Sequence, residues 1–200
     1  MSIRTDLALE SINAAKISEG ITKTERGKAF KITEINIAED KHGEKIGKKK
    51  GKYITLEGSV FSCFSKDFRE MCEEFSEELS QFVPDGKVLV VGLGNNDITP
   101  DALGPQTASK ILATRHLKEE LKDEDDFLTS LRPVGVLASG VLGQTGIETA
   151  ELIDGLMEKI DPQAIIAVDA LACSDINRLG KTIQLSDTGI SGKRRSEQTP

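Results

Sequence analysis

Aromatic residues are scarce in this sequence: there is no Trp, one Tyr and seven Phe, together 4% of its 200 positions. Proteins that hold single-stranded nucleic acid stack the bases on aromatic side chains, and this chain offers few of them. Positive charge is also in deficit, because 33 Asp and Glu against 26 Lys and Arg leave a net charge of −7. We therefore expect no direct nucleic-acid partner.

Cysteines and long apolar runs are few as well. The three cysteines, Cys63, Cys72 and Cys173, form no Cys-x-x-Cys pair. The sequence therefore predicts no disulfide framework and fits a reducing, cytoplasmic compartment. Cys72 falls on the apolar stripe of a predicted helix, where a buried thiol is expected. No apolar stretch is long enough to span a membrane and no signal peptide is recognisable, so we expect no membrane partner.

Short apolar segments alternate with amphipathic ones from residue 65 onward. The central segment, Lys87–Leu93, is rich in β-branched residues and continues into Gly94, which favours a buried parallel strand. Further strands are predicted at Val134–Ala138, Ala164–Val168 and Thr182–Leu185, and helices at Ser65–Phe82, Ala102–His116 and Ile147–Ile160. This alternation predicts an α/β fold with three layers: a mostly parallel sheet with helices on both faces.

The N-terminal part has a different pattern. Residues 29–38 alternate apolar and polar side chains, and Tyr53–Leu56 is a second short strand-like run. Between them lies the Gly-broken basic run Lys41–Lys52, which we expect to be an exposed hairpin loop. Together these segments predict an N-terminal antiparallel flap beside the main sheet. A weak amphipathic helix is predicted before them, with Thr5 or Asp6 as N-cap and an apolar face of Leu7, Leu9, Ile12 and Ile17.

Two carboxylates follow predicted core strands, and they are the candidate catalytic residues. Asp101 comes after the central strand and its turn, and Asp169 comes directly after Ala164–Val168. Parallel strands bring both to one edge of the sheet, where open α/β folds hold their active sites. Neighbouring carboxyl groups repel each other, which separates their pKa values and lets one act as base and the other as acid on a water. The alternative interpretation of Asp101 is a helix cap.

Four blocks of the sequence resemble the germination protease (spore protease) family of endospore-forming bacteria. They are IRTDLALE, VVGLGNNDITPDALGPQTASKILATRHL, GVLGQTGIETAELIDGLMEK and IIAVDALACSDINRLGKTIQLSDTGI. The resemblance implies an atypical aspartic endopeptidase that begins the degradation of small acid-soluble spore proteins during germination. It also implies an α/β fold similar to the hydrogenase-maturation peptidases, a homotetramer, and a place in the forespore or spore core. The two essential aspartates of the family match Asp101, in TPDALGP, and Asp169, in VDALA.

The resemblance further implies a zymogen that removes its own N-terminal prosegment. IRTDLALE resembles the family's cleavage site, so we expect processing between Asp6 and Leu7, with residues 1–6 as prosegment and residues 7–200 as a single α/β peptidase domain. The C-terminal part of the family is expected to be missing from this chain. A pocket for an acidic side chain needs a cation, and the candidates by charge are Arg115, Arg178, Arg194 and Arg195.

Three alternatives stay open. A metal-dependent maturation-type peptidase would need a His near Asp101, yet His116 lies about 22 Å farther along a helix at about 1.5 Å per residue, and His42 sits in the predicted loop. We therefore expect neither a metal nor another cofactor. An inactive remnant that only binds spore proteins is the second alternative. A nucleoside phosphorylase-like enzyme is the third, disfavoured because no basic phosphate site adjoins Gly94.

Overall fold

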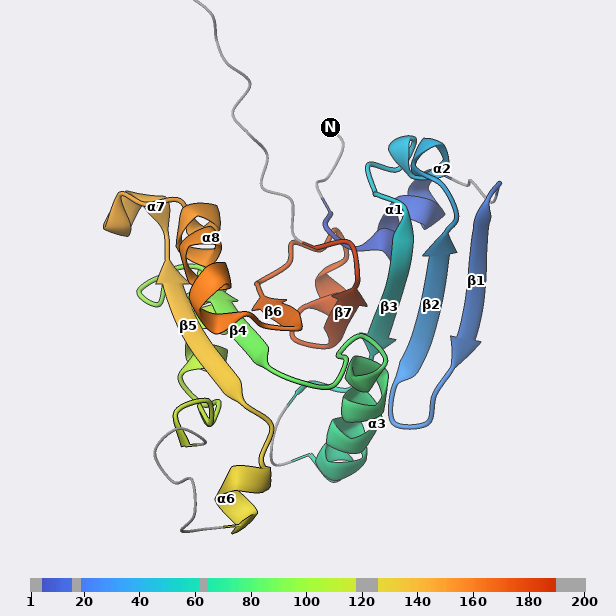
Figure 1. Cartoon of the computed structure of the whole chain (residues 1–200). Helices are drawn as coiled ribbons and strands as arrows, with labels where there is room; N and C mark the ends of the chain where they lie inside the picture. Colours follow the sequence, from blue (N-terminus) through green and yellow to red (C-terminus); the bar gives the residue numbers. More distant parts are fainter. Residues whose placement is uncertain (1–4, 16–18, 62–64, 118–125, 190–200) are drawn as a thin grey trace, which may run out of the picture. The chain divides into compact units, whose positions relative to one another are not determined.

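A computed structural model describes residues 5–15, 19–61, 65–117 and 126–189 of the chain (Figure 1). The chain forms two compact units. The first unit combines residues 1–82 with 172–200, and the second comprises Val83–Leu171. Residues 7–200, expected as one domain, are thus distributed over both units.

The first unit is built on a four-stranded antiparallel sheet. Its strands stand in the order β1 (Ile21–Arg26), β2 (Lys31–Ile37), β3 (Gly51–Glu57) and β7 (Thr182–Ser186). The register pairs Ile35 with Tyr53, and Tyr53 in turn with Ser186. The expected antiparallel flap is therefore confirmed, and it is larger than predicted. The short helix α2 (Asp40–Glu44) lies in the connection between β2 and β3, where only a loop was expected.

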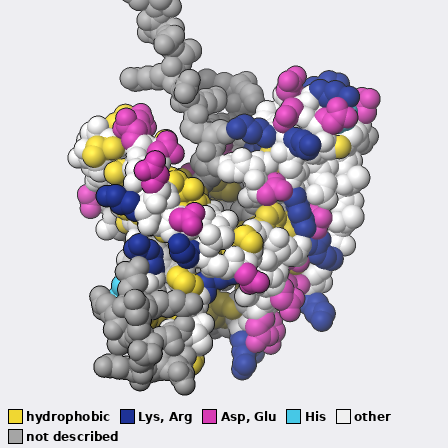
Figure 2. Space-filling model, in the orientation of Figure 1, with side chains coloured by type: hydrophobic (Ala, Val, Ile, Leu, Met, Phe, Trp, Pro, Cys, Tyr) yellow, Lys and Arg dark blue, Asp and Glu magenta, His cyan; other side chains and the backbone are white. Residues whose placement is uncertain are grey.

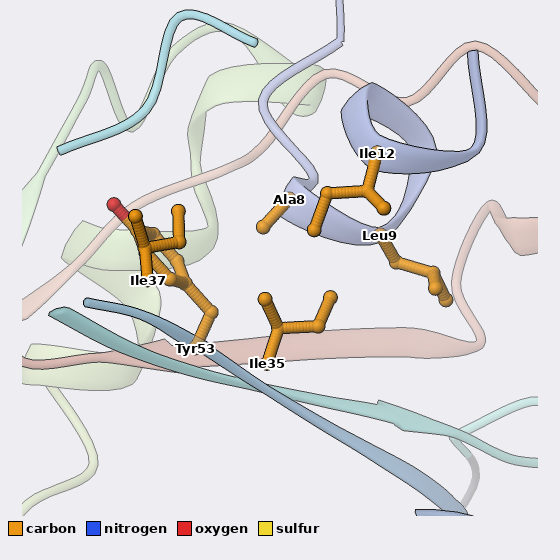
Figure 3. Close-up of a cluster of buried hydrophobic side chains, with 6 residues drawn as sticks. All are labelled: Ala8, Leu9, Ile12, Ile35, Ile37 and Tyr53. Carbon is orange, nitrogen blue, oxygen red and sulfur yellow. The ribbon is translucent and has the colours of Figure 1, made fainter. Parts of the chain in front are cut away.

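One face of this sheet is covered by α1 (Ala8–Ala15). Figure 3 shows its side chains pointing toward the strands, in a cluster made of Ala8, Leu9, Ile12, Ile35, Ile37 and Tyr53. Thr5, one of the two expected caps, accepts a hydrogen bond at Oγ1 from the Leu7 main-chain N–H at 3.1 Å. The predicted N-terminal helix is confirmed, and Ile17 lies outside the described residues.

The other face is covered by α3 (Phe68–Ser80), whose Met71 and Phe75 pack on Ile32, Ile54 and Leu56. Since alternate residues of a strand point to opposite faces, Tyr53 lies in the cluster with α1 and Ile54 lies in the cluster with α3. The prediction that the Cys72 thiol is buried is wrong, because Cys72 is exposed. Buried Met71 and half-buried Phe75 set the direction of the apolar face, and Cys72 lies just outside it.

The second unit holds a three-stranded parallel sheet in the order β5 (Val134–Gly140), β4 (Val88–Leu93) and β6 (Ala164–Val168). Val88 pairs with Val134 on one side and with Ala164 on the other, so β4 is the central strand, as predicted. The α-helices that the structure describes in this unit are α4 (Leu103–Ala108), α6 (Asp126–Ser130), α7 (Leu142–Thr145) and α8 (Thr149–Ile160).

Helices α4 and α8 lie on opposite faces of the parallel sheet. On one face, Leu89 and Val91 pack against Ile160, with Ile153 and Leu156 of α8 beside them. On the other face, Gly92 lies so close to α4 that a Cβ there would collide with the Gly104 carbonyl oxygen. Because Val91 and Gly92 point in opposite directions, the helices enclose the sheet as expected for an α/β fold.

Two details of the predicted architecture are wrong. Thr182–Leu185 was expected in the parallel sheet, yet β7 pairs antiparallel with β3, so the larger sheet of the chain is antiparallel. The helix predicted to reach His116 ends at Ala108. Farther along, the main-chain N–H groups of Thr114 and Arg115 donate to the Val134 carbonyl, at 3.0 and 3.1 Å, at the start of β5, so these residues are not helical.

Charged side chains of both signs are present on the surface. Figure 2 shows Lys, Arg, Asp and Glu side chains mixed on the face in view. Within the basic run, Lys41 pairs with Glu39 at 2.9 Å, and both side chains are exposed. Lys41, Lys45, Lys49 and Lys50 of this run are exposed, whereas Lys48 is half-buried. Among the described residues, no helix has the length and apolar composition needed to cross a bilayer.

Candidate active site

Asp101 sits at the carboxyl end of the central strand, in a short 3-10 turn, η1 (Thr99–Asp101). Its Oδ2 accepts a hydrogen bond from the main-chain N–H of Asn95 at 2.7 Å. Helix α4 begins after Ala102 without a side-chain cap, so the helix-cap interpretation of Asp101 is excluded. The carboxylate instead closes the loop that leaves β4.

Gly94 makes that closure possible. Its φ is 112°, which L side chains rarely adopt, and a Cβ there would collide with the Asp101 carbonyl oxygen and lie 3.0 Å from Oδ1. The loop therefore brings Asp101 back against the end of β4. The role of Gly94 is therefore structural: the lack of a side chain makes room for Asp101.

Asp169 directly follows β6, the strand that pairs parallel with β4. The register sets Gly92 opposite Val168, so the next positions, Leu93 and Asp169, lie at the same edge of the sheet. One carboxylate oxygen of Asp169 accepts the main-chain N–H of Ala170 at 2.8 Å. Asp169 thus comes directly after β6, and Asp101 lies in the loop that follows β4, the neighbouring parallel strand.

A third strand contributes to this edge through a residue that the sequence did not single out. Gln144 lies in α7, just after β5, and its Nε2 donates to Asn95 Oδ1 at 2.9 Å and to Asp97 Oδ2 at 3.3 Å. Asn95 Oδ1 also accepts the main-chain N–H of Asp97 at 2.9 Å. Polar groups that follow β4, β5 and β6 thus share one edge of the sheet.

Such an edge has the components of acid–base chemistry. Two carboxyl groups that follow adjacent strands can polarise a water and protonate a leaving group. The amide groups of Asn95 and Gln144 hold the loop that carries one of them. Among the described residues, no group of three or more His, Cys, Asp and Glu side chains has the arrangement of a metal site.

The expected processing bond, Asp6–Leu7, lies in the first unit. The main-chain N–H of Asp6 donates to the Ala172 carbonyl at 2.8 Å, and the Ala172 N–H donates back to Asp6 Oδ2 at 3.0 Å. The Asp6 carbonyl oxygen accepts Lys48 Nζ at 2.5 Å and Gln184 Nε2 at 3.3 Å. Lys48 and Gln184 were not singled out by the sequence.

The four candidate arginines have different surroundings. Arg178 is already paired, with Nε 3.4 Å from Glu10 and Nη2 3.1 Å from Glu57. Arg115 lies beside His116 at a cavity of about 350 Å³ on the α8 side of the parallel sheet. Apolar side chains such as Leu89 and Ile160 line this cavity, and neither catalytic candidate does. Arg194 and Arg195 lie outside the described residues.

A family model described as germination protease matches residues 3–195. The chain is 42% identical to the germination protease of Clostridium acetobutylicum over 203 aligned positions, which cover 95% of this chain and 62% of that protein. It is 40% identical to the germination protease of Priestia megaterium over 219 positions, covering 98% of this chain and 58% of the relative.

A third relative, the germination protease of Caldanaerobacter subterraneus subsp. tengcongensis, is 42% identical over 198 positions, covering 96% of this chain and 60% of that protein. The chain thus spans about three fifths of the length of the curated relatives it matches. The matched region includes both carboxylates and the Asp6–Leu7 bond.

Proposed function

The chain belongs to the germination protease family, and on that premise we propose that it is an atypical aspartic endopeptidase. Asp101 and Asp169 act on one water. The observation that carries the proposal is that these two carboxylates follow β4 and β6, neighbouring parallel strands that end at one edge of the sheet. Ligand and active sites of open α/β sheets occur at such edges.

The proposed reaction is peptide hydrolysis without a covalent enzyme intermediate. One carboxylate accepts a proton from the water, whose oxygen adds to the carbonyl carbon of the substrate. The other, in its acid form, gives a proton to the amide nitrogen as the carbon–nitrogen bond breaks. Mutual repulsion of the two charges favours a state in which the pair holds one proton. The products are a carboxylate and an amine.

The substrates we propose are small acid-soluble spore proteins, cut at germination in the spore core by a homotetramer. The motifs shared with the family support this substrate class. We also propose that the protein is made as a zymogen that cuts its own Asp6–Leu7 bond. An acidic residue before the bond and an apolar one after it make the N-terminal segment similar to the sites in the substrate.

A substrate assay with matched variants tests the proposal. The chain is incubated with a purified small acid-soluble spore protein, and product peptides are identified by mass spectrometry for wild type, Asp101→Asn and Asp169→Asn. Asp161→Asn serves as control, because Asp161 ends α8 in a left-handed conformation that Asn also adopts. We expect cutting by wild type and the control and a loss of at least 100-fold in the other two.

Undiminished cutting by Asp101→Asn and Asp169→Asn would overturn the carboxylate pair. Binding of the spore protein with no cutting by any form would instead favour the binding-only alternative. A rate that depends on an added divalent ion would favour the metal-dependent one.

A further inference from the structure

Asp6 is held at three of its atoms by residues that are distant in the sequence. Its main-chain N–H and its carboxylate are both paired with the main chain of Ala172, at 2.8 and 3.0 Å. Its carbonyl oxygen, which belongs to the Asp6–Leu7 peptide bond, is held by Lys48 Nζ and Gln184 Nε2. The same Gln184 side chain accepts the Ala8 main-chain N–H at Oε1, at 2.8 Å.

The residues after the bond are buried and helical. Leu7 is 3% exposed and Ala8 is fully buried. The Leu7 carbonyl accepts the Ser11 main-chain N–H at 3.2 Å, so the chain enters its first helical turn directly after the bond. In this state the Asp6–Leu7 bond is fixed on both sides and is not displayed as an extended, accessible strand.

Lys48 differs from the lysines beside it. Burial lowers the pKa of Lys48, and the negative charge of Asp6 opposes this shift. Its neighbours Lys49 and Lys50 are exposed. Lys48 Nζ donates to the Asp6 carbonyl oxygen, and its positive charge attracts the nearby Asp6 carboxylate, which accepts the Ala172 main-chain N–H. The charge of Lys48 thus favours an acidic residue at this position. The cation sought among the arginines is thus present as a lysine of the basic run.

We infer that Lys48, Gln184 and the main chain of Ala172 form a binding site for an acidic residue of a peptide. Asp6 fills this site in the uncut chain, and the Asp6–Leu7 bond is withheld from hydrolysis while it does so. The binding site is argued from contacts alone. That the withheld bond is the one the protein cuts rests on the proposed function.

A foreign protease measures the protection without using the chain's own activity. The full chain carrying Asp101→Asn and Asp169→Asn is treated with thermolysin, which cuts before Leu. The rate at which an N-terminus at Leu7 appears is followed by mass spectrometry. Each rate is divided by that of an unfolded peptide with the same residue 6, because thermolysin disfavours an acidic residue before the bond. Adding Lys48→Met, or separately Asp6→Asn, is expected to raise this rate roughly tenfold, because proteolysis follows the population of the opened segment. Lys49→Met is the control for loss of one lysine charge and is expected to match the parent.

A double variant tests whether the two residues act as a pair. Lys48→Met combined with Asp6→Asn is expected to raise the rate little beyond either change alone. Gln184→Ala gives a second route to the same opening if Lys48→Met lowers the thermal stability of the first unit. A Lys48→Met rate equal to that of Lys49→Met, in a chain that unfolds like its parent, would overturn the site.

The same substitution in the catalytically intact chain separates this inference from the proposed function. Lys48→Met is then expected to speed self-processing at Leu7. If thermolysin reveals the protection and no form ever processes itself, the proposed self-processing fails and the site stands. If self-processing occurs and Lys48→Met changes neither rate, the site fails and the proposed function stands.

Discussion

The main-chain N–H of Asn95 donates a 2.7 Å hydrogen bond to the carboxylate of Asp101, six residues later. The side chain of the same Asn95 is fixed by the Asp97 N–H and by Gln144. The orientation of Asp101 therefore depends on a loop tied to two of the three parallel strands. If Asp101 is catalytic, changes in this loop affect the reaction without touching the carboxylate.

Gly94→Ala is predicted to abolish activity while the second unit stays folded. A Cβ at Gly94 would collide with the Asp101 carbonyl oxygen and would need a backbone conformation that Ala avoids. A displacement of about 1 Å can reduce a rate roughly 100-fold, and we expect at least that loss in spore-protein cutting. Gly155→Ala in α8 is the control, because nothing lies within 4 Å of a Cβ there. Equal activity of the two variants, measured by product release, would contradict this role of the loop.

Gln144→Ala is predicted to lower kcat roughly tenfold with little change in KM. The substitution removes the 2.9 Å bond to Asn95 and frees the loop that orients Asp101, whereas substrate contacts elsewhere are unaltered. Steady-state kinetics on a peptide substrate measure both constants. Gln106→Ala, at an exposed position of α4, should behave as wild type. A rise in KM alone would show that Gln144 binds substrate instead of orienting the loop.

The parallel strands were predictable because buried strands carry nearly continuous apolar runs. Residues 164–168 have the predicted bounds in β6. Strand β1 was missed because five of its six positions are exposed, and its sequence ITKTER carries one apolar residue. The prediction that β7 belongs to the parallel sheet was wrong, because a short alternating segment indicates a strand without indicating its partner. That partner, β3, is more than 120 residues away in the chain.

Asp101 and Asp169 could be placed near strand ends from the sequence because that placement depends only on where a strand ends, and their catalytic role stays a prediction. Asn95, Gln144 and Lys48 were missed because their roles depend on tertiary contacts. Gln144 meets a residue 49 positions away, and Lys48 meets one 42 positions away. In the sequence, Asn95 looks like a turn former, Gln144 is one polar residue in a Gly-rich stretch, and Lys48 is one lysine among many.

Arg26→Met is predicted to destabilise the first unit by roughly 1–2 kcal/mol, less than for a fully buried pair because the Arg26 side chain is 37% exposed. Arg26 pairs with Glu78 through two bonds, at 3.1 and 2.7 Å, and with Glu34 at 2.8 Å. Glu78 is 6% exposed, so removing its cation leaves a buried carboxylate without that partner. Urea unfolding measures the change in free energy of unfolding. Arg69→Met is the matched control: its partner Glu73 and Arg69 itself are exposed, and the expected cost is within about 0.5 kcal/mol. Similar costs for both variants would contradict the prediction.

Glu10 is predicted to make the stability of the first unit pH-dependent below pH 4.5. Burial alone would raise the pKa of Glu10, but hydrogen bonds from Ser174, Thr5 and the Asp175 main chain outweigh it and lower the pKa from 4.5 to about 2. A carboxyl group whose pKa is lower in the folded state stabilises that state fully above pH 4.5. The stabilisation is lost as the pH falls from 4.5 toward 2, because the unfolded chain then binds the proton first.

Glu10→Gln removes this contribution, which is roughly 3 kcal/mol at neutral pH. Urea unfolding of wild type and variant should therefore differ most near pH 7, and the difference should shrink as the pH approaches 2. Glu44→Gln, at an exposed position of α2, should follow the wild-type profile throughout. A constant gap between Glu10→Gln and wild type from pH 7 to pH 2 would show that the lost stability comes from packing. In that case, the charge of Glu10 and its bonds to Ser174 and Asp175 do not hold α1 against the segment that binds Asp6.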